Sequence, residues 1–274
     1  MILTFAPAVV TAGTGQVGAP VGRAAKGKAG IEQQERAATG VNPVVKMFPG
    51  EIVYHQGFND GTLIPEIGSV KKVQDPKSCE FGEGGVFGGC LVAGSLRFGQ
   101  DSGGEWFLNT LAPWTLIVWV RYVEDPPQGE KTGFDFFFAD VDAPPGDRGR
   151  FMMLKLHDCA IAGIYEYFEG KKRFAKSTTT AVAYERSWSN PWRKGEWRMF
   201  ALSYGAGKLS ISQNGTDLHT VALDKRVYGP KGVEIRAPSI KGTSRFYELD
   251  EVTVLNRELS ENELIAIYKE SIKE

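Results

Sequence analysis

Cysteine, histidine and net charge are all scarce in this 274-residue chain. The 32 basic and 33 acidic side chains nearly cancel, and a net charge of −1 gives no overall attraction to nucleic acid or anionic lipid. The longest strongly apolar run, residues 111–120, contains Pro113 and has about half the length of a membrane-spanning helix. We therefore expect neither a nucleic-acid partner nor a transmembrane segment.

The few cysteines and histidines also limit catalytic and metal chemistry. Cys79, Cys90 and Cys159 are too few for a disulfide framework, so we expect three reduced thiols, with a bridge between Cys79 and Cys90 as the alternative. No Cys-x-x-Cys or His-x-x-x-His spacing supports a zinc site. The three histidines accompany no Gly-x-Ser-x-Gly elbow, which argues against nucleophilic catalysis.

Residues 1–47 differ from the rest in composition. They hold nine alanines and seven glycines, a single aromatic residue, Phe5, and no acidic residue before Glu32. Such a segment cannot bury enough apolar surface to offset the entropy of ordering, so we expect an extended low-complexity arm that something must hold. We expect the arm to cross the surface of another protein subunit; the alternatives are its own domain and a lattice contact.

The same arm bears on the compartment. Its apolar start, residues 1–10, has no preceding charge and is broken by Pro7, unlike a secretory signal. The shortage of acidic residues is typical of organelle transit peptides, although serine is absent and arginine is rare. We therefore expect assembly in the cytoplasm or an organelle rather than secretion.

From residue 48 onward the sequence is typical of β structure. Residues 115–122 (TLIVWVRY) carry apolar side chains on both faces, with Val118 on one face and Trp119 on the other. A strand with two apolar faces is covered on both sides, so this one should be central.

Two local signals are specific. Residues 208–213 alternate between apolar and polar side chains and are followed by Asn214-Gly215, which predicts a hairpin because both residues tolerate positive φ. Thr216 completes a glycosylation sequon there, but the turn explains the asparagine. Ser260 and Glu263 form a capping box that predicts a helix at the C-terminus.

Four segments, taken in order, resemble the laminin-G-like and pentraxin-type domains of the concanavalin A-like lectin/glucanase superfamily. These segments are residues 57–62 (GFNDGT), residues 94–98 with 114–120, residues 195–204 with 207–209 and 214–215, and residues 249–260 with the closing helix. The resemblance covers roughly residues 50–274. It implies an all-β fold, a jelly-roll β-sandwich of two antiparallel sheets with a short C-terminal helix and an extended N-terminal arm. The chain then divides into the arm, residues 1–47, and a concanavalin A-like jelly-roll domain, residues 48–274.

The resemblance does not imply a function, because this fold carries lectins, glycosidases and structural modules. Glycosidases of the superfamily place carboxylates on one strand as Glu-x-Asp-x-Glu or Glu-x-Asp-x-x-Glu, and the nearest match is Glu248 with Asp250. The third carboxylate is missing, because Val252 or Thr253 stands in its place. We therefore expect no enzyme activity.

Asp250 still needs a role, because the strand pattern places it on one face with Val252 and Val254, where it should be buried. The resemblance implies two options: hydrogen bonds from the backbone amides of a neighbouring loop, or a structural calcium ion completed by Asn59 and Asp60. Calcium takes six or more oxygens, so we favour hydrogen bonds and expect no cofactor, with calcium as the alternative.

The remaining candidates are aromatic or charged loop residues. Tyr184, Trp188 and Trp192 are candidates for a lid over the core or for a protein interface, with glycan contact third. The acidic group at Asp140, Asp142 and Asp147 and the basic run at residues 171–173 should be solvated surface.

The leading interpretation is a non-catalytic structural or accessory subunit of a larger assembly, which docks through the sandwich and the arm. The alternative is a carbohydrate-binding, lectin-like module, with or without calcium. The third interpretation is a divergent glycoside hydrolase that uses Glu248 and Asp250.

Overall fold

The computed structural model describes residues 41–68, 74–99, 112–124, 134–141, 143–156, 160–181, 183–184, 191–223, 230–237, 239–240 and 244–273. The predicted arm lies outside the described residues except for positions 41–47, and Trp188, Asp142 and Cys159 also lie outside them. None of the helices in these ranges is long and apolar enough to cross a membrane.

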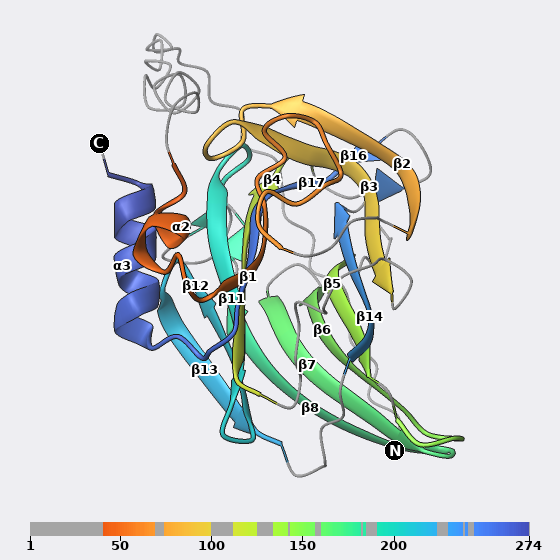
Figure 1. Cartoon of the computed structure of the whole chain (residues 1–274). Coiled ribbons are helices and arrows are strands. Elements are labelled where there is room, and N and C mark those ends of the chain that lie inside the picture. The colour runs from red at the N-terminus through yellow and green to blue at the C-terminus, as the bar shows by residue number, and fades with distance from the viewer. Residues whose placement is uncertain are drawn as a thin grey trace, which may run out of the picture.

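The described chain is almost entirely β structure (Figure 1). Its helices are α2 (Pro43–Met47) and α3 (Glu261–Ser271). Its strands are β1 (Ile52–Gln56), β2 (Gln74–Glu83), β3 (Gly89–Gly99), β4 (Trp114–Tyr122), β5 (Phe134–Val141), β6 (Arg148–Leu156), β7 (Ala160–Glu169), β8 (Lys172–Ala181), β9 (Ala183–Tyr184), β10 (Pro191–Trp192), β11 (Trp197–Gly205), β12 (Lys208–Gln213), β13 (Thr216–Ala222), β14 (Pro230–Ala237), β15 (Ser239–Ile240), β16 (Ser244–Arg245) and β17 (Tyr247–Leu255).

Thirteen strands form one continuous sheet in the order β13-β12-β11-β4-β17-β3-β14-β5-β6-β7-β8, with β1 beside β17 and β2 beside β3. The sheet curves until β8 approaches β12 and β13, so its two halves face each other. A methyl group on Gly163 of β7 would lie 2.3 Å from Leu202 of β11 across the core, which shows how closely the halves pack. Strand β9 pairs with β10, and β15 with β16, in two small separate sheets. The prediction of an all-β fold is confirmed, whereas the strands that enclose the core join in one large sheet where we expected two.

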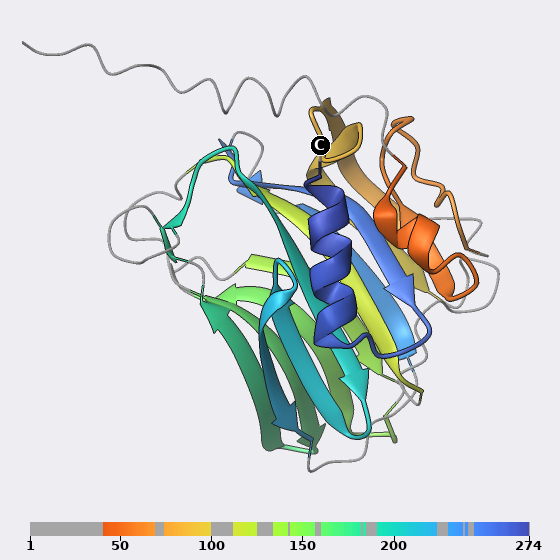
Figure 2. The ribbon, with the colours of Figure 1, turned by 90° about the vertical axis from the view of Figure 1, so that its left-hand side faces the viewer.

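Strand β4 confirms the prediction of a central strand with two covered faces. It lies between β11 and β17, and Leu116, Val118 and Val120 enter the main core inside the curved sheet. Ile117 and Trp119 point the other way, into a second apolar cluster on the outer face of the sheet. Helix α3 lies across this outer face (Figure 2).

Helix α3 begins as the sequence predicted. The Ser260 side chain accepts a hydrogen bond from the backbone of Glu263, and Glu263 returns one to the backbone of Ser260. Leu264 and Ile267 are fully buried in the outer cluster. The predicted hairpin between β12 and β13 turns through Asn214 and Gly215, both at positive φ.

Helix α2 falls within the segment that we assigned to the arm. Pro43 and Val44 are buried, and α2 packs beside α3 on the same outer face of the sheet. Asn42 caps α2, since its side chain accepts a hydrogen bond from the backbone of Val44. Residues 42–47 therefore pack against the β domain.

A β-bulge interrupts β17 where its pairing with β4 slips, between Asp250 and Thr253. Glu251 sits in the bulge with φ 53°, which is unusual for a residue with a side chain. Asp250 lies opposite Trp119 and faces outward with it, whereas Val252 enters the main core. The expectation that Asp250 shares a face with Val252 and Val254 was wrong, because the extra residue reverses the alternation.

Cys79 and Cys90 are free thiols rather than a bridge. The register places Cys90 opposite Gly82, three residues along β2 from Cys79.

Candidate functional site

Three segments that lie far apart in sequence meet at one rim of the sheet: the turn at residues 57–61 after β1, the loop at residues 84–88 between β2 and β3, and the bulge of β17. Glycine allows the turn and the loop to touch. A Cβ atom on Gly88 would lie 2.0 Å from Oδ1 of Asn59, and one on Gly89 would lie 2.4 Å from the carbonyl oxygen of Phe58. A side chain on Gly89 would displace the backbone of the turn, and one on Gly88 would displace the side chain of Asn59.

Asp250 and Asn59 hold the loop from two sides. Oδ2 of Asp250 accepts a hydrogen bond from the backbone of Val86 at 2.6 Å, and Oδ1 accepts one from the backbone of Glu251 at 2.8 Å. Oδ1 of Asn59 accepts one from the backbone of Gly89 at 2.9 Å. Burial of Asp250, and then the charge of Glu251, raise the pKa of Asp250 well above its usual value. The structure thus shows Asp250 bonded to the backbone amides of a neighbouring loop, as we favoured from the sequence.

The three proposed calcium ligands lie in the same region but are used differently. Asp60 is exposed and accepts a hydrogen bond from the backbone of Thr62 at 2.9 Å, which lowers the pKa of Asp60. Asn59 and Asp250 direct oxygens at backbone amides of the loop. The described residues include no group of three or more His, Cys, Asp or Glu side chains that could hold a metal ion.

Glu248 fixes the base of the same loop through Arg121. Its carboxylate forms a largely buried ion pair with the guanidinium of Arg121. Arg121 donates from Nη1 to the carbonyl oxygen of Gly84 at 2.7 Å and lies over the ring of Trp197 at 4.7 Å. The indole nitrogen of Trp197 donates to the same carbonyl at 3.1 Å, so two donors anchor the loop at its first residue, Gly84.

Glu251 joins a second network that sequence reasoning missed. The side-chain amide of Asn42 donates to Glu251, and Nε2 of His55 lies 3.6 Å from Glu251 and 3.3 Å from Glu66. Nδ1 of His55 lies 2.9 Å from the hydroxyl of Thr253. Burial raises the pKa of Glu251 to about 7, whereas the hydrogen bond with His55 lowers the pKa of Glu66. A third carboxylate directly after Asp250, in an otherwise apolar strand, was the available signal.

These carboxylates do not form a hydrolytic pair. A glycosidase needs two carboxyl groups that face a substrate groove. Asp250 and Glu251 are 0% and 1% exposed, and Glu248 is bonded to Arg121. None of the three lines the pocket beside them. The carboxylates of Glu248, Asp250 and Glu251 instead hold the loop and the turn in place.

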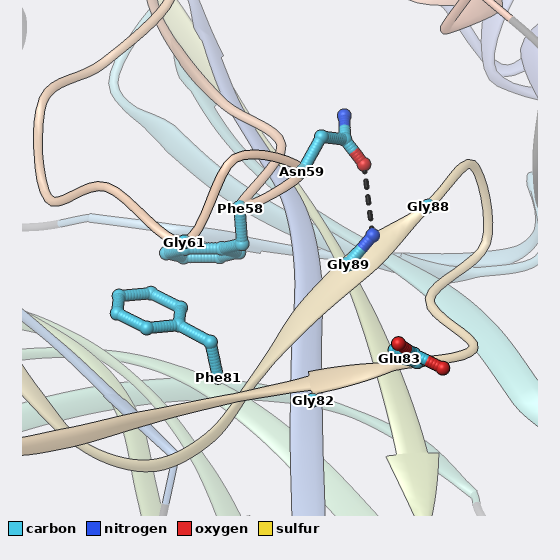
Figure 3. Close-up of a pocket in the computed structure, with 8 residues that line it drawn as sticks. All are labelled: Phe58, Asn59, Gly61, Phe81, Gly82, Glu83, Gly88 and Gly89. Atoms are coloured by element: carbon cyan, nitrogen blue, oxygen red, sulfur yellow. Dashed lines mark hydrogen bonds between the residues drawn. The ribbon is translucent and has the colours of Figure 1, made fainter.

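A pocket of about 350 Å³ opens between the turn and the loop (Figure 3). It is lined by Phe58, Asn59, Gly61, Phe81, Gly82, Glu83, Gly88 and Gly89. Figure 3 shows the rings of Phe58 and Phe81 facing each other at one end and the carboxylate of Glu83 at the other. The ring centroids lie 6.2 Å apart. Phe58 holds φ 57°, a strained value for an aromatic residue, as is common where a protein binds a ligand.

The aromatic candidates lie elsewhere. Trp192 is fully buried, its indole nitrogen donates to the carbonyl oxygen of Glu196 at 2.8 Å, and its ring packs against Phe200 and Tyr247. It belongs to the core and cannot serve as a ligand platform. Tyr184 lies on β9, which pairs with β10, but its side chain is outside the described residues, as is the whole of Trp188.

The second acidic group is structural where it is described. Oδ1 of Asp147 accepts a hydrogen bond from the backbone of Gly170 at 3.0 Å, and Oδ2 accepts one from the hydroxyl of Tyr167 at 2.8 Å. Asp147 therefore joins the β5–β6 turn to the β7–β8 hairpin. Asp140 is an exposed residue of β5.

Neither a family model nor a curated protein matches the sequence. Solved structures do match the fold. The binding domain of Paraclostridial mosquitocidal protein 1 superposes with a TM-score of 0.61 at 11% identity, over 80% of this chain and 52% of that one. The botulinum neurotoxin serotype D binding domain gives 0.58 at 10% identity, over 80% and 52%. The serotype G receptor binding domain gives 0.52 at 13% identity, over 80% and 51%.

The chain thus spans about half the length of the solved binding domains that it matches. All three are named as binding domains rather than catalytic ones. At this level of identity the likeness shows a shared β-rich fold.

Proposed function

We propose that the chain is a non-catalytic binding module whose ligand enters the pocket between residues 57–61 and 84–88. One observation carries this proposal: the carboxylates of β17, where related glycosidases keep their catalytic groups, are directed into the protein and brace the rim of an open pocket. The names of the structural neighbours support a binding role.

In its finer form, the proposal is that the chain has the laminin-G-like, concanavalin A-like sandwich fold and serves as an accessory subunit of a protein assembly. The rim then docks to a partner protein, and residues 1–40 supply a second contact. A braced loop suits this role, because a preformed site loses little conformational entropy on binding. We propose no cofactor; calcium bound near Asn59 and Asp60 is the alternative.

A carbohydrate ligand is the second candidate. The partly exposed ring of Phe81 can pack against the apolar face of a sugar, and the amide nitrogen of Asn59 can donate to a hydroxyl group. A few polar groups around an apolar wall are typical of small-ligand sites.

The test is saturation-transfer NMR on the whole chain with a library of soluble oligosaccharides and short peptides, with and without EDTA. The variant Phe81→Ala removes one wall of the pocket, and Phe174→Ala, far away on β8, is the matched control. Binding that is lost in the first variant and kept in the second supports the proposal. Failure of every compound at millimolar concentration contradicts it.

Hydrolysis is measured in parallel on chromogenic glycosides. The proposal expects no turnover above the background of a heat-denatured sample. Turnover that disappears in Asp250→Asn would restore the hydrolase interpretation.

A further inference from the structure

Four exposed carboxylates lie on the described segments that border the pocket. They are Asp60 and Glu66 on the β1 side and Glu80 and Glu83 on β2. Arg121, at the base of the loop, is already neutralised by Glu248. The residues that line the pocket include no Lys, Arg or His. A partner that enters the pocket therefore meets the carboxylate of Glu83, and the lining residues add no positive charge.

Glu83 is the acidic residue that belongs to the pocket itself. Its side chain is exposed at the mouth and has no hydrogen-bond or ion-pair partner in the part of the chain that the structure describes. The neighbouring acids differ: Glu66 is bonded to His55 and to the backbone of Gly57, and Asp60 accepts from Thr62. The lining residues thus offer one free carboxylate.

The aromatic pair lies at the other end of the same pocket (Figure 3). The faces of aromatic rings attract cations and also pack against methylene groups. A lysine or arginine side chain combines both properties, with an apolar stem and a charged head. Phe58 is 1% exposed and backs the ring of Phe81, so the stem would pass the partly exposed ring of Phe81, and the head would reach Glu83.

We infer that the pocket receives a basic side chain, lysine or arginine, from a partner polypeptide. This inference rests on the proposed binding function and names the chemistry of its ligand. The carboxylate of Glu83 selects a cation, the ring of Phe81 accepts the stem, and the braced loop keeps the site open before the partner arrives.

The test is NMR titration of the ¹⁵N-labelled whole chain with capped pentapeptides of the form Gly-Gly-X-Gly-Gly, where X is Arg, Lys, Gln or Glu. The Arg and Lys peptides should shift the amides of Gly82, Glu83 and Gly89, and the Gln and Glu peptides should not. The variant Glu83→Gln should lower the affinity for the Arg peptide about fivefold. Raised salt should lower that affinity further. Glu80→Gln, which removes the same charge from the same strand outside the pocket, should leave the affinity within about twofold.

The outcomes separate the inference from the function on which it rests. If the Gln peptide or a sugar shifts the same amides as strongly as the Arg peptide, the pocket binds ligands but the choice of a basic side chain is wrong. Equal losses in Glu83→Gln and Glu80→Gln also overturn the inference, because general electrostatics then explain the affinity. If no peptide and no sugar shifts these amides, the proposed binding function fails as well.

Discussion

Replacing Glu251 by glutamine should stabilise the protein at alkaline pH and leave its stability unchanged in acid. Burial raises the pKa of this carboxyl from 4.5 to about 7. A group whose pKa is higher in the folded state adds stability that is complete below the unfolded pKa and lost as the pH rises through the folded pKa. Wild-type stability from this group is therefore lost between about pH 4.5 and 7.

The size of the effect follows from the same shift. One pKa unit corresponds to about 1.4 kcal/mol, so ionising Glu251 in the folded protein costs on the order of 3 kcal/mol. Glutamine avoids this cost and can still accept the hydrogen bond from Asn42. The attraction to His55, 3.6 Å away, is already part of that pKa, so the net gain should stay on the order of 3 kcal/mol at pH 8. For a domain of this size a gain of that order raises the Tm by roughly 5–10 °C.

The assay is thermal unfolding followed by circular dichroism at about pH 5 and pH 8, with Glu83→Gln as the exposed control. Comparing the variant with the wild type at each pH isolates Glu251 from the other titrating groups. A Tm for Glu251→Gln below wild type at pH 8, or a gain of the same size at both pH values, would show that the ionised carboxylate of Glu251 does not destabilise the fold.

Three further substitutions test the braces around the site and the helix. Gly88→Ala should lower the free energy of unfolding in urea by about 1–3 kcal/mol, because its methyl group would lie 2.0 Å from a side-chain oxygen. Gly50→Ala, with open space around it, should change the free energy of unfolding by no more than about 0.5 kcal/mol. Equal effects would show that the turn and the loop do not touch. Glu248→Ala leaves Arg121 largely buried without its partner and should cost about 2 kcal/mol or more; a neutral result would mean that water already screens the pair. Ser260→Ala removes the cap of α3 and should lower the free energy of unfolding in urea by about 1 kcal/mol. No change would show that the cap is not formed in solution.

The features that sequence reasoning predicted well depend on neighbours along the chain. Alternation in residues 115–122 fixed both faces of β4, and Asn214-Gly215 fixed a hairpin. Ser260 and Glu263 fixed the start of α3. In each case the physical cause, such as side-chain periodicity or a tolerated positive φ, acts within a few residues and is visible in the sequence.

The features that sequence reasoning missed depend on a one-residue shift in strand register and on contacts between residues far apart in the sequence. A one-residue bulge at Glu251 turned Asp250 to the opposite face from the one that strict alternation gives. The contact between Asn42 and Glu251 joins residues 209 positions apart, and no local pattern encodes it. Trp192 follows a Ser- and Pro-rich segment that is typical of a surface loop, yet its ring is fully buried against Phe200 and Tyr247, which lie far from it in the sequence or on another strand.

The most direct measurement is amide hydrogen exchange of Val86 in Asp250→Leu, a substitution that keeps the branched shape of the side chain but removes both acceptor oxygens. If Asp250 braces the pocket loop, the exchange of Val86 should rise about tenfold or more relative to wild type, while the amide of Leu116 in central β4 stays protected. Unchanged protection of Val86 in a folded variant would contradict the account, because the carboxylate would then have no part in holding the rim.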